Sequence, residues 1–265
     1  MLKNWRELEN FLNKITKLDS DYFLSEAVNQ VYLCVEDDMP KFTEFLDPFR
    51  LQYTFDVLAG IQKFGVNLHG YGGFPYAERK MLGFFPNEID EEKFPISRIK
   101  LDFASKFGEL THRDILGAVL GLGLNRNVVG DISVLIDGAV VAVDSKVKDY
   151  LNNNLLKVGR ASVETSILPL DSEFFALDNR VKERIICVSL RLDAVLAATF
   201  RLTRGEISGL IKSGKAFVNW VKADSSSKTV QSGDMITLRK FGRLQIDDIV
   251  GKSKKERYLI DIIRF

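Results

Sequence analysis

The chain has 265 residues, of which 46% are hydrophobic and 28% are charged, and its formal net charge is +1. This is the composition of a soluble globular protein that is long enough for two or three modest domains. The sequence holds no apolar run long enough to span a membrane and no secretory segment, so we expect a cytoplasmic protein without membrane insertion.

Cysteine and histidine are scarce. Cys34 and Cys187 stand in apolar surroundings without a CxxC partner, so we predict that both are buried small hydrophobes. The only histidines are His69 and His112, so the chain has four cysteines and histidines in all, spread widely along the sequence. We therefore expect no structural zinc site. We therefore expect no metal and no cofactor.

Residues 1–90 are predicted to form an N-terminal α/β domain. Helical spacing runs from Trp5 to Ile15, and a second helix is predicted over 21–32. A glycine-rich segment over 68–80 ends on Arg79-Lys80. It is either a binding loop, with these cations as secondary RNA contacts, or a connecting loop whose glycines form a turn, and the sequence favours neither.

Residues 91–180 have the β-α-β-β-α-β order of the ferredoxin-like, RRM-like fold. Thr111 with Asp114 predicts a helix start, and Ser145 a second one, while Asp137-Gly138 predicts a hairpin turn. The predicted segments are strand 96–103, helix 111–120, strand 132–136, strand 140–143, helix 146–156 and strand 162–168.

This order alone does not confer RNA binding. RNA-recognition motifs stack bases on aromatic residues of their central strands, and strand 139–144 has none. We therefore expect contacts through loops, or through Arg113 and Arg126 near helix ends. A contact with protein is an equally good reading of this domain.

Residues 181–265 are predicted to form a third domain. Leu192, Leu196 and Phe200 form one apolar stripe of a short helix. Thr203 followed by Glu206 is a capping box that starts a second helix, which Gly214 ends. Alternating residues over 216–219 and 236–239 predict strands.

Charge is concentrated in this third domain, which has 17 Lys and Arg against 9 Asp and Glu, whereas residues 1–180 have 20 against 27. Such asymmetry is typical of a nucleic-acid-binding module. Arg204 falls in the first turn of the second helix, where free backbone N–H groups favour phosphate. The other basic candidates are Arg191, Arg201, Lys212, Lys215, Arg239, Lys240 and Arg243.

These segments resemble the alpha-L, ribosomal S-four-type RNA-binding fold, in Arg191-Leu192-Asp193, Leu202 to Ile207, Leu210 to Asn219 and Gly233 to Arg239. The resemblance implies that this domain reads structured RNA. It assigns contacts to Arg191, Asp193, Arg204, Lys212 and Lys215. Trp220 stands where a small turn residue is common, and we expect a buried ring there rather than an exposed one.

Further upstream, Phe45 to Pro48, Gly72-Gly73, Ala77-Glu78-Arg79, Glu109 to Leu124, Arg126 and Gly130-Asp131-Ile132 resemble YlmH-type proteins. With the third domain, the similarity covers nearly the whole chain. It implies a three-part α+β, non-enzymatic factor that binds ribosomal RNA and tRNA on large ribosomal subunits carrying an obstructing peptidyl-tRNA, in ribosome-associated quality control. A link to cell division also goes with the family.

Enzyme readings are weaker. Gly242-Arg243-Leu244 is similar to a pseudouridine synthase signature, but Gln245 replaces the carboxylate nucleophile. His112-Arg113-Asp114 lacks the other motifs of a kinase. An RNA-modifying methyltransferase with an appended RNA-binding domain stays open, as does an adaptor that binds cell-division proteins through the acidic first 180 residues.

Overall fold

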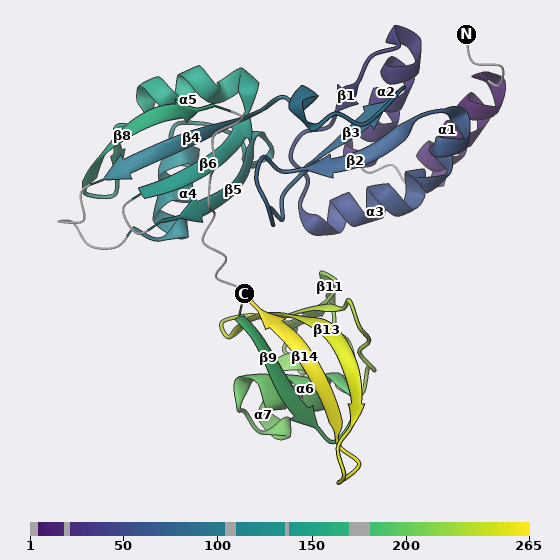
Figure 1. The fold of residues 1–265 in the computed structure, drawn as a ribbon, viewed down its shortest axis with the longest axis vertical. Coiled ribbons are helices and arrows are strands. Elements are labelled where there is room, and N and C mark those ends of the chain that lie inside the picture. The colour runs from purple at the N-terminus through teal and green to yellow at the C-terminus, as the bar shows by residue number, and fades with distance from the viewer. Residues whose placement is uncertain (1–4, 19–21, 104–109, 136–137, 170–180) are drawn as a thin grey trace. The chain divides into compact units, whose positions relative to one another are not determined.

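The computed structural model describes residues 5–18, 22–103, 110–135, 138–169 and 181–265. Contacts divide the chain into two compact units, Met1–Leu177 and Asp178–Phe265 (Figure 1). The mixed α/β character expected from the sequence is confirmed, with helices and several sheets. No helix among the described residues is long and apolar enough to cross a membrane.

The first part of unit 1 packs helices onto a small antiparallel sheet. Its order of strands is β1-β3-β2. Buried leucines and a buried Phe84 join the sheet to the helices, and the free thiol of Cys34 is buried among them, as predicted. The elements are α1 (Trp5–Leu18), α2 (Tyr22–Asp37), β1 (Lys41–Phe42), α3 (Pro48–Leu58), the 3-10 helix η1 (Ala59–Phe64), β2 (Asn67–Tyr71) and β3 (Met81–Phe85).

The second part of unit 1 has a sheet in the order β5-β6-β4-β8-β7, which is the order of the split βαβ fold, with one short strand added at the edge. Its neighbours are all antiparallel. The elements are η2 (Glu91–Lys93), β4 (Ile96–Phe103), α4 (His112–Gly121), η4 (Arg126–Val128), β5 (Val129–Val134), β6 (Gly138–Asp144), η5 (Ser145–Val147), α5 (Lys148–Asn154), β7 (Lys157–Val158) and β8 (Ala161–Leu168).

Local signals predicted most of these elements. Thr111 and Asp114 form the capping box of α4 as predicted. The β5–β6 hairpin is confirmed by its pairing, although residues 136–137 of its turn lie outside the described residues. The next helix, predicted over 146–156, is the 3-10 helix η5 followed by α5 over Lys148–Asn154. Asp144, rather than Ser145, accepts the capping hydrogen bond of η5, from the backbone N–H of Lys146.

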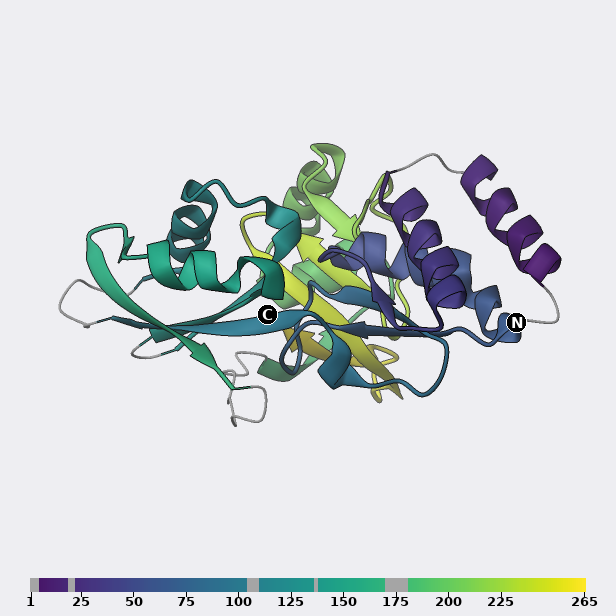
Figure 2. The same cartoon turned by 90° about the horizontal axis from the view of Figure 1, so that it is seen from above.

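Helices α4 and α5 cover one face of this sheet (Figure 2). Ile99 and Val141 point into that core, so the alternate residues of β4 and β6 point to the other face. Those residues include Arg98, Lys100 and Val140, and none of the alternate positions described on these two strands is aromatic. This face offers no rings on which bases could stack.

A third cluster of buried side chains joins the two sheets of unit 1. Phe45 and Phe74 come from the first part, and Ile96 and Ala142 come from the second. Gly130 also lies at this seam. A larger residue would not fit there, because a Cβ at this position would lie only 2.6 Å from the ring of Phe45. The two parts of unit 1 are therefore joined by a shared cluster of buried side chains.

Unit 2 has a six-stranded antiparallel sheet in the order β11-β10-β12-β13-β14-β9. Helices α6 and α7 pack on it through Leu192, Leu196, Ile207 and Ile211. The expected apolar stripe, the capping box and the strand alternation are all present. The elements are β9 (Val181–Cys187), α6 (Leu192–Phe200), α7 (Arg204–Lys212), β10 (Ala216–Val218), β11 (Val221–Lys222), β12 (Met235–Leu238), β13 (Gly242–Lys252) and β14 (Tyr258–Arg264).

The contribution of the α7 capping box to the stability of unit 2 can be tested directly. Thr203 Oγ1 accepts the N–H of Glu206 at 3.2 Å, and Glu206 accepts the N–H of Thr203 at 2.8 Å. Thr203→Ala should lower the stability of unit 2 by about 1 kcal/mol and its Tm by about 5 °C. Thr203→Ser, which keeps the hydroxyl, should melt close to the wild type in the same thermal scan. Equal losses in both variants would show that the methyl group, not the cap, matters.

Candidate nucleic-acid interface

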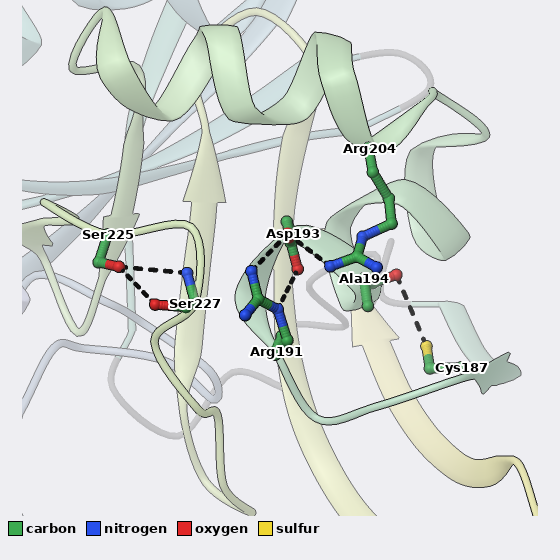
Figure 3. Close-up of polar contacts among 7 residues, drawn as sticks. All are labelled: Cys187, Arg191, Asp193, Ala194, Arg204, Ser225 and Ser227. Atoms are coloured by element: carbon green, nitrogen blue, oxygen red, sulfur yellow. Dashed lines mark hydrogen bonds and ion pairs between the residues drawn. The ribbon is translucent and has the colours of Figure 1, made fainter.

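Two arginines meet at one buried carboxylate where α6 and α7 begin (Figure 3). Arg191 is the N-cap of α6, and its Nε and Nη2 donate to the Asp193 oxygens at 3.1 and 3.0 Å. Arg204 opens α7 and donates through Nη2 at 2.7 Å. The side chain of Asp193 is only 7% exposed, whereas those of Arg191 and Arg204 are 40% and 50% exposed. We call these residues the Arg191–Asp193–Arg204 cluster.

Electrostatics keep this cluster charged. Burial on its own would raise the pKa of Asp193, but the hydrogen bonds from Arg191 and Arg204 outweigh it, and the pKa is lowered. The hydrogen bond to Asp193 in turn raises the pKa of Arg191. The cluster therefore presents two cationic groups fixed in direction by one shared anion, and its net charge is positive.

Asp193 is buried, and its carboxylate faces the guanidiniums of Arg191 and Arg204. It therefore holds both arginine side chains in a fixed direction. Arg204 is half-exposed, and its guanidinium is paired with Asp193. Removing its side chain takes one of the two partners from a buried carboxylate.

The helix N-termini are less open than expected. At α6, the backbone N–H groups of Leu192 and Asp193 donate to the carbonyls of Lys228 and Ser226 at 2.8 and 3.1 Å. The loop that supplies these carbonyls is ordered by a 2.7 Å contact between the Ser225 and Ser227 hydroxyls (Figure 3). At α7, the Glu206 carboxylate already lies beside the first turn. Free N–H groups were expected at the start of α7, where the capping box occupies the N–H of Glu206.

The remaining basic candidates of unit 2 lie apart from the cluster. Arg201 has a left-handed backbone at the end of α6, and Lys212 lies in the last turn of α7, with Lys215 just beyond it. The turn from β12 to β13 holds Lys240 and lies beside the end of α6, because the rings of Phe241 and Phe200 are 6.2 Å apart. Arg239 stands over the ring of Phe217 at 4.6 Å and Arg243 over that of Phe265 at 5.0 Å.

Trp220 is not in the core, where we had expected it. It is partly exposed, and the buried cluster of unit 2 does not include it. Asn219 and Trp220 have φ angles of 50° and 62° and form the two-residue turn between β10 and β11, in which Val218 pairs with Val221. A left-handed conformation costs a bulky residue about 1–2 kcal/mol, so the turn is strained.

The secondary candidates of unit 1 are largely occupied by the protein itself. Arg79 donates to the carbonyls of Phe45 at 2.8 Å and of Arg126 and Val129 at 3.2 Å each. Arg126 donates to the carbonyl of Gly130 at 2.9 Å. Burial, followed by the repulsion from Arg79, lowers the pKa of Arg126 to about 10, so it remains charged at neutral pH.

Lys80 and Arg113 complete the secondary set. The backbone of Lys80 forms a bridge with Leu46. Arg113 is exposed in the first turn of α4. The glycine-rich segment that contains Arg79 packs into the seam through Phe74 and Ala77, which are buried. The connecting reading of this loop is therefore the one that the packing supports.

Sequence reasoning missed several features of unit 2. It placed no ring beneath Arg239 and no loop over the start of α6. It also did not single out Arg184, although this residue makes a two-point ion pair with Asp261, at 2.5 and 2.8 Å. A cross-strand partner cannot be seen in sequence, because Arg184 and Asp261 face each other only once β9 and β14 pair. The spacing of Arg191 and Asp193 at a helix start was the one usable signal.

Comparison with known proteins agrees with this geometry. Residues 190–236 match the family model "S4 domain", and residues 89–172 match "Putative RNA-binding domain in YlmH". These matches define a protein with a C-terminal S4 domain and a YlmH-type RNA-binding domain before it. Ribosome-associated protein quality control protein P2 of Bacillus subtilis (strain 168) is 33% identical over 249 residues, which cover 93% of this chain and 95% of that protein. The chain belongs to the YlmH-type family of RNA-binding proteins.

A solved structure named cell division protein ylmH, from Streptococcus pneumoniae, is 25% identical to this chain with a TM-score of 0.46. The match covers 56% of this chain and 89% of that one. The resemblance to the YlmH-type family that the sequence suggested is thus confirmed by the relative from Bacillus and by the two domain matches.

Proposed function

We propose that this protein is a non-enzymatic factor that binds structured ribosomal RNA or tRNA through unit 2. Its partner would be the large ribosomal subunit carrying an obstructed peptidyl-tRNA, in ribosome-associated quality control in the cytoplasm. The observation that carries the proposal is the Arg191–Asp193–Arg204 cluster, which fixes two exposed guanidiniums on a unit with 18 basic and 10 acidic residues. The Bacillus relative, named as a ribosome-associated quality control protein, supports the choice of particle.

Binding without bond-making is the reading that the fold favours. The sheet of residues 96–168 is antiparallel throughout its described strands, whereas a methyltransferase of the nucleotide-binding type has a mainly parallel sheet. Gln245 lies within β13, paired with Met235 and Ile263, and it has no carboxylate for a nucleophilic role. These features support the proposal that the chain contributes recognition only.

Salt dependence gives the first test in solution. If unit 2 neutralises about five to seven phosphates, the logarithm of affinity should fall against the logarithm of salt with a slope of roughly −4 to −6. The measurement is a titration of a labelled ribosomal RNA stem-loop at several salt concentrations. Arg204→Ala should weaken binding about tenfold and make the slope shallower by about 1, since it removes one oriented cation. Arg257→Ala, which removes an exposed cation from the turn between β13 and β14, is the matched control.

Crosslinking in cells identifies the RNA. We expect fragments of large-subunit ribosomal RNA and tRNA to be enriched with the intact protein and to drop with Arg204→Ala but not with Arg257→Ala. No enrichment over background would refute the proposal. Recovery of every partner by residues 1–180 alone would instead favour an adaptor for division proteins, which the excess of 27 acidic over 20 basic residues in that region would suit.

A further inference from the structure

The turn between β10 and β11 holds a tryptophan where the backbone favours glycine. Asn219 and Trp220 both have positive φ, and Val218 pairs with Val221 across the turn. Two-residue hairpins of this kind prefer Asn-Gly, because glycine alone adopts the second position without strain. Asn219 satisfies the preference, whereas Trp220 at 62° does not.

The turn is held by Asn219, not by the indole ring. The Asn219 side chain donates to Asp234 Oδ1 at 2.8 Å and accepts the N–H of Met235 at 2.9 Å. The backbone N–H of Asn219 donates to the carbonyl of Met235 at 2.7 Å. Asp234 is 5% exposed and also accepts the N–H of Gln231, so this lock is rigid. The strained position would be kept whatever side chain followed Asn219.

The ring of Trp220 lies outside the hydrophobic core. Trp220 is partly exposed and partly covered, and it is absent from the buried core of unit 2 and from the residues packed against that core. Across the described residues it also takes part in no ring pair or hydrogen bond. Strained residues of this kind cluster at binding sites, where a ligand can supply the compensation.

The surroundings of the turn suit a nucleic acid. Lys222 follows the turn by two residues, and its Cα partner Phe217 carries Arg239 over its ring at 4.6 Å. Val221, at the start of β11, is 53% exposed. The ammonium of Lys222 lies at Gly214, so these cations belong to the same small sheet as the turn without flanking the Trp220 ring. An exposed aromatic ring on a basic surface is an arrangement on which proteins stack a base while cations nearby hold its phosphate. In a paired A-form helix the base faces are already stacked, so the base must be unpaired.

We propose that Trp220 is a base-stacking residue, which the Asn219 lock presents to an unpaired nucleotide of the bound RNA. The inference rests on the proposed function and adds a second point of contact to it. The Arg191–Asp193–Arg204 cluster would orient the backbone of structured RNA, and Trp220 would select positions with a free base.

The test uses the full chain and a pair of labelled RNA probes. One is a stem-loop with unpaired loop nucleotides, and the other is the same stem as a blunt duplex. Trp220→Gly should weaken binding of the stem-loop about tenfold and leave the duplex unchanged. Its Tm should be equal to or above that of the wild type, since glycine removes the strain. Trp220→Phe, which keeps a ring, should retain most of the affinity for the stem-loop.

A second measurement reads Trp220 directly. The chain has only two tryptophans, so Trp5→Phe leaves Trp220 as the sole one. Adding the stem-loop should quench its fluorescence and protect it from acrylamide, and adding the duplex should do neither. Equal affinity of Trp220→Gly and wild type for both probes would overturn the stacking role, and so would a clear loss of Tm, which would show a packing role.

The two proposals fail in different ways. If Arg204→Ala weakens binding to both probes while Trp220→Gly changes neither, RNA binding by unit 2 stands and the stacking role is wrong. If the wild type shows no binding to either probe above background, the proposed function itself fails.

Discussion

Asp193→Ala is expected to lower the Tm of unit 2 by about 10 °C, which corresponds to about 2 kcal/mol in a domain of this size. The carboxylate accepts three charge-assisted hydrogen bonds from Arg191 and Arg204, with the longest at 3.1 Å. Each such bond to a charged group is worth more than a neutral one. The loss stays below that of a fully buried ion pair, because the guanidiniums are 40% and 50% exposed and can be hydrated.

The experiment follows the fluorescence of Trp220 in a Trp5→Phe background during a thermal scan, so that unit 2 is observed alone. Asp247→Ala is the control, since this carboxylate is 43% exposed and lies 3.5 Å from Lys182. The control should shift the Tm by only a degree or two. A similar shift in both variants would mean that Asp193 acts as an ordinary surface acid.

The same variant separates charge from orientation in RNA binding. Asp193→Ala removes a negative charge, so attraction to phosphate alone would make binding tighter. If the carboxylate serves to orient Arg191 and Arg204, binding to the stem-loop should instead weaken about fivefold. Tighter binding would show that net charge, and not the fixed direction of the guanidiniums, dominates the interface.

The contribution of Asp193 should also depend on pH. Its folded-state pKa is held below the ordinary value near 3.9 by the hydrogen bonds from Arg191 and Arg204. A depressed pKa gives stability that is complete above the unfolded value and is lost as the pH falls through the folded value. The difference in Tm between wild type and Asp193→Ala should thus be constant near neutral pH and shrink below about pH 4.

The features that were predictable from sequence depend on neighbours along the chain. Thr111 with Asp114 and Thr203 with Glu206 are capping boxes whose partners lie three residues apart, and both helices start there. The order of helices and strands along residues 96–168 followed from alternation, helix starts and one hairpin signal. Local signals of this kind need no tertiary contact to be recognised.

The features that were missed depend on long-range packing. The sequence places Asp193 beside a cation but does not show that the carboxylate is buried, because burial comes from the fold around it. Trp220 has the size of a core residue, and only the pairing of β10 with β11 shows that its position is a turn. Arg79 reads as a loop cation next to glycines, whereas its partners lie 34 to 50 residues away.

Arg79 is therefore the residue at which the structure favours one of the two readings that the sequence left open. Arg79→Met keeps the bulk of the stem but removes the donors to the carbonyls of Phe45, Arg126 and Val129. The carbonyl of Val129 keeps the Arg126 guanidinium and that of Arg126 keeps the N–H of Val129, so the carbonyl of Phe45 suffers the main loss. The lost hydrogen bonds at this partly buried seam should cost about 2 kcal/mol in total. For a unit of this size the Tm should fall by about 6 °C. The fluorescence of Trp5 in a Trp220→Phe background reports on unit 1 alone.

Arg113→Met is the matched control, because it removes an exposed arginine from the first turn of α4. It should leave the Tm of unit 1 nearly unchanged. Neither variant should alter the affinity of the full chain for the stem-loop at a temperature where both units are folded, since the proposed interface lies in unit 2. If Arg79→Met instead kept its Tm and lost affinity for RNA, the glycine-rich segment would be a binding loop after all, and the RNA interface would extend onto unit 1.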